Sequence, residues 1–80
     1  MKKFQVWVEG FLATGQSGKA QLVGEIWAES FDEAVQQVYK ERYPDEAERN
    51  RWFRKSESGY WVEWGCRIYD NEADARKVFG

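Results

Sequence analysis

The sequence is 80 residues long, which suffices for one domain and is too short for two. Twelve Lys and Arg stand against 14 Asp and Glu, and the formal net charge of −2 excludes the strongly basic surface of a general nucleic-acid binder. Five Trp, four Tyr and five Phe supply the large side chains that a small core needs. We therefore expect a single domain, residues 1–80, stabilised by aromatic packing.

Cysteine usage and the N-terminus bear on the cellular compartment. The single cysteine, Cys66, can form no internal disulfide, which is typical of a reducing compartment. The N-terminal residues turn polar at Gln5 and Glu9, unlike a signal peptide, and no stretch approaches the roughly 18 apolar residues of a membrane span. We expect a soluble cytoplasmic protein without a membrane partner or a cleaved leader.

Alternating polarity near the N-terminus predicts a β-hairpin. Residues 4–8 have the period-two pattern of a half-buried strand, and residues 10–14 are a candidate extension beyond a bulge. Residues 15–19 have the composition of a turn, and residues 20–29 alternate again, with Leu22 and Ile26 in one phase.

A helix is predicted directly after the hairpin. Ser30 and Glu33 have the spacing of a capping box, in which the serine hydroxyl accepts the Glu33 amide and the glutamate reaches back to the serine amide. Pro44 disfavours helical geometry at the preceding residue and should end the helix. The apolar face of this helix comprises Phe31, Ala34, Val35, Val38 and Tyr39.

The second half of the chain predicts strands and a short final helix. Residues 45–58 fit a helical first turn as well as a strand; we favour a short helical turn followed by a strand, and both alternatives stay open. Residues 60–69 alternate throughout and predict the longest strand. Asp70 or Asn71 can cap a helix over residues 72–79. The predicted fold is α+β, an antiparallel sheet of three or four strands with the main helix packed on one face.

The sequence predicts no catalytic residue, metal or cofactor. It contains no histidine, which removes the usual general base and the common zinc ligand sets. The turn at residues 15–20 lacks the spacing and the hydroxyl of a phosphate loop. Glu9, Glu25 and Glu63 share a strand phase and could pair as acid and base, but side chains pointing to solvent are the simpler interpretation. Cys66 is interpreted as a small buried hydrophobic residue, and we predict that the chain is not an enzyme.

The strand phases predict an aromatic face. If Val6, Ile26, Val62 and Trp64 face the helix, then Val23 and several aromatic residues lie on the opposite side of the sheet. One helix cannot cover both faces, so the aromatic face is either an interaction surface or a second core covered by another segment. The predicted binding residues are Trp7, Trp27, Trp61, Tyr69 and Arg67.

A local basic cluster is a second candidate site, for anions. Its cations surround Trp52 and Phe53, a combination that suits a phosphate or single-strand surface. Acidic residues at 45, 46 and 48 lie beside it, so a solvated, salt-bridged segment is favoured over a nucleic-acid site. The cluster consists of Arg49, Arg51, Arg54 and Lys55.

Four stretches resemble small proteins of bacterial mobile elements and phages to which no activity is assigned. They are residues 6–10 (Val-Trp-Val-Glu-Gly), 13–15 (Ala-Thr-Gly), 29–34 (Glu-Ser-Phe-Asp-Glu-Ala) and 64–76 (Trp-Gly-Cys-Arg-Ile-Tyr-Asp-Asn-Glu-Ala-Asp-Ala-Arg). The resemblance runs nearly end to end, and its most specific part is residues 64–76. It implies a bacterial or phage cytosolic origin, no catalytic residues and an accessory role, inhibition of host defence among the roles.

These observations lead to one functional prediction and two rivals. The leading hypothesis is a non-enzymatic module that occupies the surface of a partner, which is another protein or a second copy in a homodimer. The main rival is a binder of a nucleotide-like ligand, with a Trp ring on the base and Arg67 or Arg51 on a phosphate. The third, less favoured, is weak nucleic-acid binding through residues 49–55.

Overall fold

The computed structural model describes residues 1–11 and 17–80. One antiparallel sheet contains β1 and β2, and a second contains β3, β4 and β5 in that order. The predicted α+β class with antiparallel strands is confirmed, although the strands form two sheets. The elements are β1 (Lys2–Phe11), β2 (Ser17–Ala28), α1 (Phe31–Arg42), α2 (Glu46–Trp52), β3 (Phe53–Lys55), β4 (Trp61–Glu63), β5 (Cys66–Arg67) and α3 (Glu72–Phe79).

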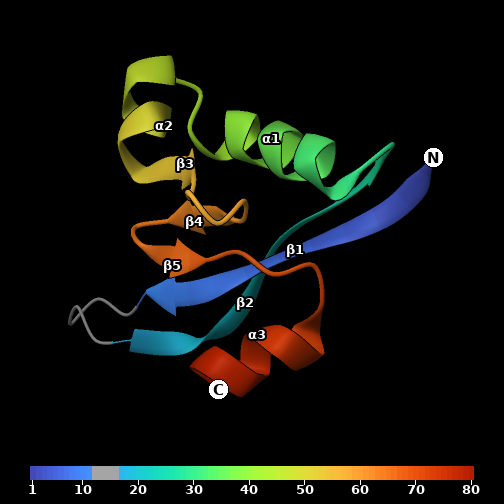
Figure 1. The fold of residues 1–80 in the computed structure, drawn as a ribbon, viewed down its shortest axis with the longest axis vertical. Helices are drawn as coiled ribbons and strands as arrows, with labels where there is room; N and C mark the ends of the chain where they lie inside the picture. The colour runs from blue at the N-terminus through green and yellow to red at the C-terminus, as the bar shows by residue number, and fades with distance from the viewer. Residues whose placement is uncertain (12–16) are drawn as a thin grey trace.

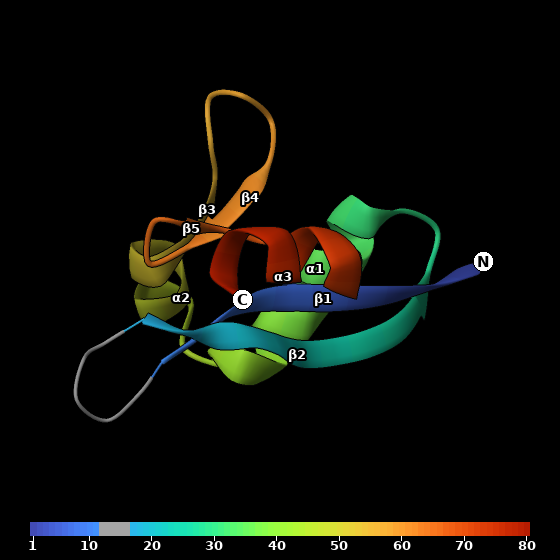
Figure 2. The same ribbon diagram turned by 90° about the horizontal axis from the view of Figure 1, so that it is seen from below.

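The β1–β2 hairpin lies between two helices, α1 on one side and α3 on the other (Figures 1 and 2). The second sheet and α2 lie at the C-terminal end of α1 (Figure 1). The predicted turn at residues 15–19 falls in part outside the described residues, and Ser17–Ala28 is strand. Residues 12–14 of the candidate extension also lie outside the described residues.

A β-bulge in β2 changes the predicted faces of the hairpin. Val6 pairs with Gly24, but the next residue of β1, Trp7, pairs with Leu22, so Val23 is an extra residue in β2. Leu22 and Ile26 therefore fall on opposite faces, and their predicted common phase is wrong. Val23, predicted on the aromatic face, packs against the same core cluster as Ile26.

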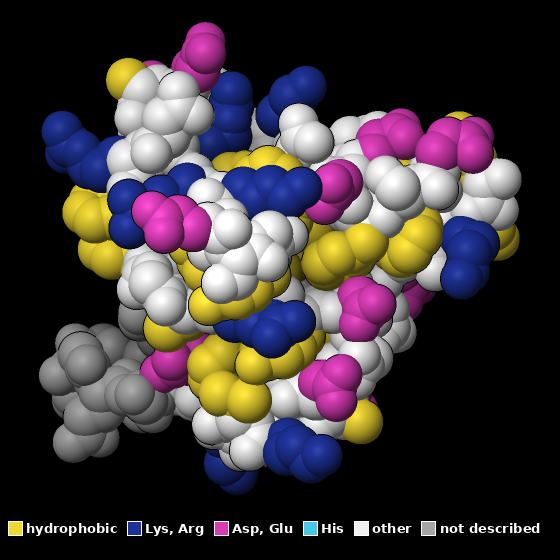
Figure 3. Space-filling model, in the orientation of Figure 1, with side chains coloured by type: hydrophobic (Ala, Val, Ile, Leu, Met, Phe, Trp, Pro, Cys, Tyr) yellow, Lys and Arg dark blue, Asp and Glu magenta, His cyan; other side chains and the backbone are white. Residues whose placement is uncertain are grey.

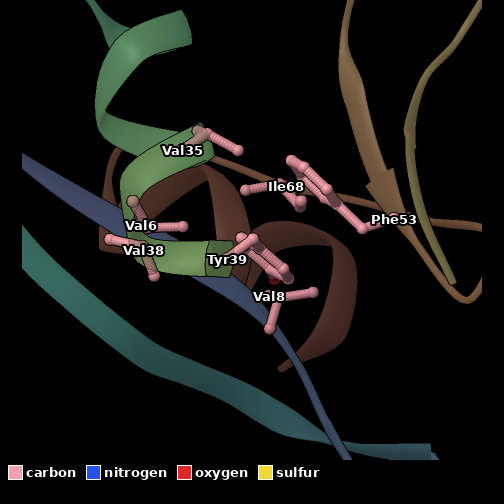
Figure 4. Close-up of a cluster of buried hydrophobic side chains, with 7 residues drawn as sticks. All are labelled: Val6, Val8, Val35, Val38, Tyr39, Phe53 and Ile68. Atoms are coloured by element: carbon pink, nitrogen blue, oxygen red, sulfur yellow. The ribbon is translucent and has the colours of Figure 1, made fainter. Parts of the chain in front are cut away.

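The main core lies between β1, α1 and the second sheet (Figure 4). Gly24 allows α1 to approach the hairpin closely, because a Cβ atom there would lie 2.7 Å from a methyl group of Val38. The side chains converge from elements that are distant in sequence, and their burial is the main stabilising contribution. The cluster comprises Val6, Val8, Val35, Val38, Tyr39, Phe53 and Ile68.

Caps define α1 as expected. The Ser30 hydroxyl accepts the Glu33 amide at 3.2 Å, and the helix ends at Arg42, two residues before Pro44. The return bond of the capping box differs from the prediction, because the Glu33 carboxylate accepts the amide of Glu29 at 3.2 Å instead of that of Ser30.

Residues 45–58 contain a short helix followed by a strand, which is the arrangement that the sequence favoured. The Asp45 carboxylate caps α2 by accepting the Ala47 amide at 2.9 Å, and β3 follows α2 without a loop. The final helix has the predicted bounds, and Asn71 caps it by accepting the Asp74 amide at 2.8 Å.

The long strand predicted at residues 60–69 is wrong. The segment is a hairpin, β4 and β5, joined by a two-residue turn in which Trp64 has φ 55° and Gly65 has φ 82°. Positive φ at both central residues matches the right-handed twist of the flanking strands. The chain then leaves β5, and Tyr69 forms an isolated antiparallel bridge with Trp7.

Candidate functional site

The predicted aromatic face is not a single surface. Trp7 is 9% exposed, and because Val6 and Val8 on either side of it belong to the α1 core, it points to the side covered by α3. Trp27, near the other end of the hairpin, is 58% exposed. Tyr69 lies edge-on to Phe79 of α3, with ring centroids 5.8 Å apart. The part of the predicted aromatic face that lies beneath α3 is therefore covered by another segment and is not an open interaction surface.

Three of the five predicted binding residues, Trp61, Arg67 and Tyr69, line one surface hollow of about 240 Å³. The Arg67 guanidinium lies over the rings of Tyr60 and Tyr69, 4.6 and 5.2 Å from their centroids. Carboxylates at positions 32, 70 and 74 also line the hollow. Because these carboxylates oppose the charge of a phosphate, the hollow is poorly suited to the anionic part of a nucleotide.

A stacked pair of Trp rings that is not among the predicted binding residues lies at the β4–β5 turn. The rings of Trp52 and Trp64 are stacked with centroids 3.6 Å apart and planes 8° from parallel. Trp64 was predicted to face the helix, but the turn places it at the hairpin tip, where it is 48% exposed. The Arg51 guanidinium lies 5.8 Å from the Trp52 ring. We call Trp52 and Trp64 the Trp platform.

A buried carboxylate lies directly beside this turn. Glu63 is fully buried and accepts Tyr39 Oη at 3.0 Å, Arg42 Nε at 2.8 Å and Tyr43 Oη at 2.5 Å. Burial raises the pKa of the Tyr39 and Tyr43 phenols, and Glu63 beside them adds to the effect. Both phenols are therefore donors at neutral pH. We call these four residues the Glu63 brace.

The Glu63 brace extends to the Trp platform. Tyr43 Oη donates to Glu63 and accepts the indole Nε1 of Trp64 at 3.1 Å. The backbone amide of Trp64 donates to the carbonyl of Trp52 at 2.8 Å. The Glu63 carboxylate is fully buried and accepts from three donors, so it supports the turn.

The prediction that three glutamates point to solvent fails for two of them. Glu25 is exposed and pairs with Lys3 at 2.8 Å, but Glu63 and Glu9 are buried. Glu9 Oε2 accepts the thiol of Cys66 at 3.1 Å. Burial, together with this carboxylate, raises the pKa of the half-buried Cys66 thiol to about 11. The thiol is thus protonated at neutral pH and disfavoured as a nucleophile.

The predicted basic cluster is divided among several partners. Arg51 lies over Trp52, and Lys55 forms an ion pair with Asp32 at 2.9 Å. Only Arg49 and Arg54 of the four line a common hollow, and Lys40 of α1, absent from the prediction, lines it too. The extended basic surface that nucleic-acid binding would use is therefore not formed by this segment.

Two sequence signals could have indicated the residues that were missed. A Trp-Gly pair between two short β-prone runs is compatible with a two-residue turn, which would have separated Trp64 from the core. Tyr39, Arg42 and Tyr43 have i, i+3 and i+4 spacing on one helix face, so three polar donors point in one direction. In the structure these three donors meet one buried acceptor, Glu63.

Comparison with protein-family models, with curated proteins and with solved structures finds no match to this chain. Within residues 1–11 and 17–80, no group of three or more Cys, Asp or Glu is arranged to hold a metal ion. No helix in the described part of the chain is long and apolar enough to cross a membrane.

Proposed function

We propose that the chain is a non-enzymatic protein-binding module that occupies the surface of a partner through the Trp platform. The observation that carries this proposal is the stacking of Trp64, which is exposed at the tip of a hairpin, on the half-buried Trp52 of α2. Tryptophan is enriched among the residues that dominate interface energies, because it combines a large apolar area with few rotatable bonds.

The backbone at the platform supports the same conclusion. Trp64 has φ 55°, which is unfavourable for a residue with a large side chain and is common at functional sites. Its bonds to Tyr43 and to the Trp52 carbonyl hold the ring in place. A ring that is already ordered loses little conformational entropy on binding, so the Glu63 brace favours affinity.

The surroundings of the platform indicate what the partner surface should look like. A shallow hollow of about 540 Å³ beside the two rings is also lined by Asp45, Glu48 and Arg51. An aromatic centre with a charged margin matches the usual anatomy of protein interfaces. We propose a partner with an apolar pocket and polar edges. The resemblance to mobile-element and phage proteins favours a bacterial host protein, a defence component among them, and a second copy of the chain is the other candidate.

Replacing Trp64 by Gly tests this proposal, because glycine retains the φ of the turn while the ring is removed. We expect the circular dichroism spectrum to stay that of a folded domain and partner capture from a bacterial lysate, or self-association by size measurement, to fall by at least about tenfold. Trp27→Ala is the matched control, since Trp27 is exposed and lies in β2, which belongs to the other sheet. If Trp27→Ala abolishes binding and Trp64→Gly does not, the proposal is wrong.

The rival function, capture of a nucleotide-like ligand by a Trp ring with Arg67 or Arg51, has less support. Trp61 is stacked on Phe53 at 4.8 Å and donates to Asp32, and both arginines already lie over aromatic rings. Saturable quenching of Trp fluorescence by a nucleotide that Arg67→Ala removes would favour the rival.

A further inference from the structure

A second hollow lies where α1, α2 and β3 meet, and it has a different character from the others. Its volume is about 410 Å³, and its cations come from three elements: Lys40 of α1, Arg49 of α2 and Arg54 of β3. Figure 3 shows Lys and Arg side chains gathered beside an apolar strip over this part of the molecule. The remaining wall consists of Gln36, Asn50, Phe53 and Trp61.

Among the described residues, no acidic partner faces the cations inside this hollow. No acidic residue is among the described residues that line it. Lys40 and Arg54 take part in no ion pair within residues 1–11 and 17–80, and Arg49 uses one guanidinium nitrogen to donate to the Tyr43 carbonyl at 2.9 Å. Lys55, one residue beyond Arg54, is by contrast paired with Asp32. Like charges that converge in one concavity favour an anion between them.

The chemistry of the lining selects the kind of anion. Guanidinium groups match phosphate oxygens with paired hydrogen bonds, and the amides of Gln36 and Asn50 add neutral donors. The volume is within the range of small-ligand sites. Trp61 is not free to stack on a base, because Phe53 and Lys55 already lie against its ring. We propose that this hollow binds a small polyphosphate anion, inorganic or nucleotide-borne, through its phosphate groups alone.

An extended nucleic acid fits the surroundings less well. Glu41 and Glu48 are the sequence neighbours of the lining residues Lys40 and Arg49, and the chain carries a net charge of −2. These carboxylates repel phosphates that extend beyond the hollow. A compact ligand with two or three phosphates places its charge near the three cations only.

The experiment is a titration of the full chain with inorganic pyrophosphate at low salt, followed by Trp fluorescence and calorimetry. We expect saturable binding that Lys40→Gln and Arg54→Gln each weaken by at least about tenfold. Arg51→Gln is the matched control, since this arginine belongs to the same segment but does not line the hollow, and it should stay within about twofold of wild type. Circular dichroism verifies that each variant is folded.

A second arm separates the two sources of the phosphate groups. Tripolyphosphate and ATP should bind within about threefold of each other, because the base makes no contact. The proposal is overturned by absence of saturable binding up to about 10 mM pyrophosphate, by an equal loss of affinity in Arg51→Gln, or by ATP binding at least about tenfold more tightly than tripolyphosphate.

Discussion

The layered region, in which the β1–β2 hairpin lies between α1 and α3, and the second-sheet region, formed by α2 and β3 to β5, are stabilised by different means. In the layered region, Val6, Val8 and Val35 are completely buried in an apolar cluster, and the buried Glu9 accepts the thiol of Cys66 in β5. In the second-sheet region, short strands are held by stacked rings and by the fully buried Glu63. Apolar burial is tolerant of geometry, whereas a buried carboxylate needs each donor in place.

This difference accounts for where the candidate surfaces lie. The layered region buries Trp7 beneath α3, leaves Trp27 exposed near one end of the hairpin, and provides the scaffold. The second-sheet region exposes Trp64 and, with α1, forms the hollow lined by Arg54. Short strands cannot bury both faces, so surfaces for partners and ligands are more readily built there. The following substitutions test this comparison.

Val35→Asp should unfold the domain. Val35 is completely buried on the α1 face that packs on the hairpin, and an unpaired charge there costs several kcal/mol, which is comparable to the whole stability of a small domain. A thermal melt followed by circular dichroism measures the effect, and Gln36→Asp on the exposed neighbour is the control. Wild-type melting of Val35→Asp would contradict the packing of α1 on the hairpin.

Glu63→Gln should be the most damaging polar substitution in the second-sheet region. It keeps the shape but removes the charge that pairs with Arg42, so we expect a loss of about 3 kcal/mol in the free energy of unfolding, measured by urea denaturation. In the layered region, Glu25→Gln removes an exposed pair with Lys3 and should leave the midpoint almost unchanged. Equal effects of the two substitutions would show that the Glu63 brace contributes no more than a surface pair.

Gly65→Ala tests the turn that carries the Trp platform. Gly65 has φ 82° and open space around its Cα, so the cost is that of the backbone alone, about 1–2 kcal/mol. In Gly65→Ala, the exciton signal of the stacked Trp pair in circular dichroism should also weaken. Gly59→Ala has the same kind of cost at φ 92° in the β3–β4 loop but should leave that signal intact. An unchanged signal in both variants would mean that the turn does not hold the platform.

Alkaline pH should weaken the contact between the two regions at Cys66. The pKa of its thiol is raised from 9.0 to about 11, so the unfolded chain releases this proton first and stability falls as the pH rises from about 9 to about 11. Across this pH range, the urea midpoint of Cys66→Ala should fall less than that of the wild type. The raised pKa values of Tyr39 and Tyr43 act in the same direction and account for a residual loss above about pH 10. Identical pH profiles for wild type and Cys66→Ala would exclude the thiol as a contributor.

The double substitution Arg51/Arg54→Ala should have the smallest effect on stability, about 0.5 kcal/mol or less. Both side chains are exposed and neither belongs to the Glu63 brace. Chemical denaturation measures it. A loss of several kcal/mol would show that these arginines stabilise the second-sheet region as well as lining its surfaces.

Local signals in the sequence determined α1 and α3. Ser30 and Asn71 cap helices whose apolar residues recur at helical spacing, so each helix is specified within one or two turns of chain. The alternation in the N-terminal segments also predicts the β1–β2 hairpin. From the sequence, Trp61, Arg67 and Tyr69 could be predicted as binding residues, and Cys66 as a small hydrophobic residue. The gathering of Trp61, Arg67 and Tyr69 around one hollow follows from β4, β5 and the Tyr69 bridge.

Only the tertiary structure decided the bulge at Val23, the turn at Trp64 and the burial of Glu63. A bulge depends on pairing between strands, and periodicity within β2 carries no signal for it. Alternating apolar and polar residues at 60–69 predict one strand, and the left-handed Trp64 becomes acceptable through its bonds to Trp52 and Tyr43. The donors of Glu63 lie 20 to 24 residues away, in α1 and at its C-cap residue Tyr43. A carboxylate can be buried only when such distant donors converge on it, and no pattern confined to its own strand specifies that.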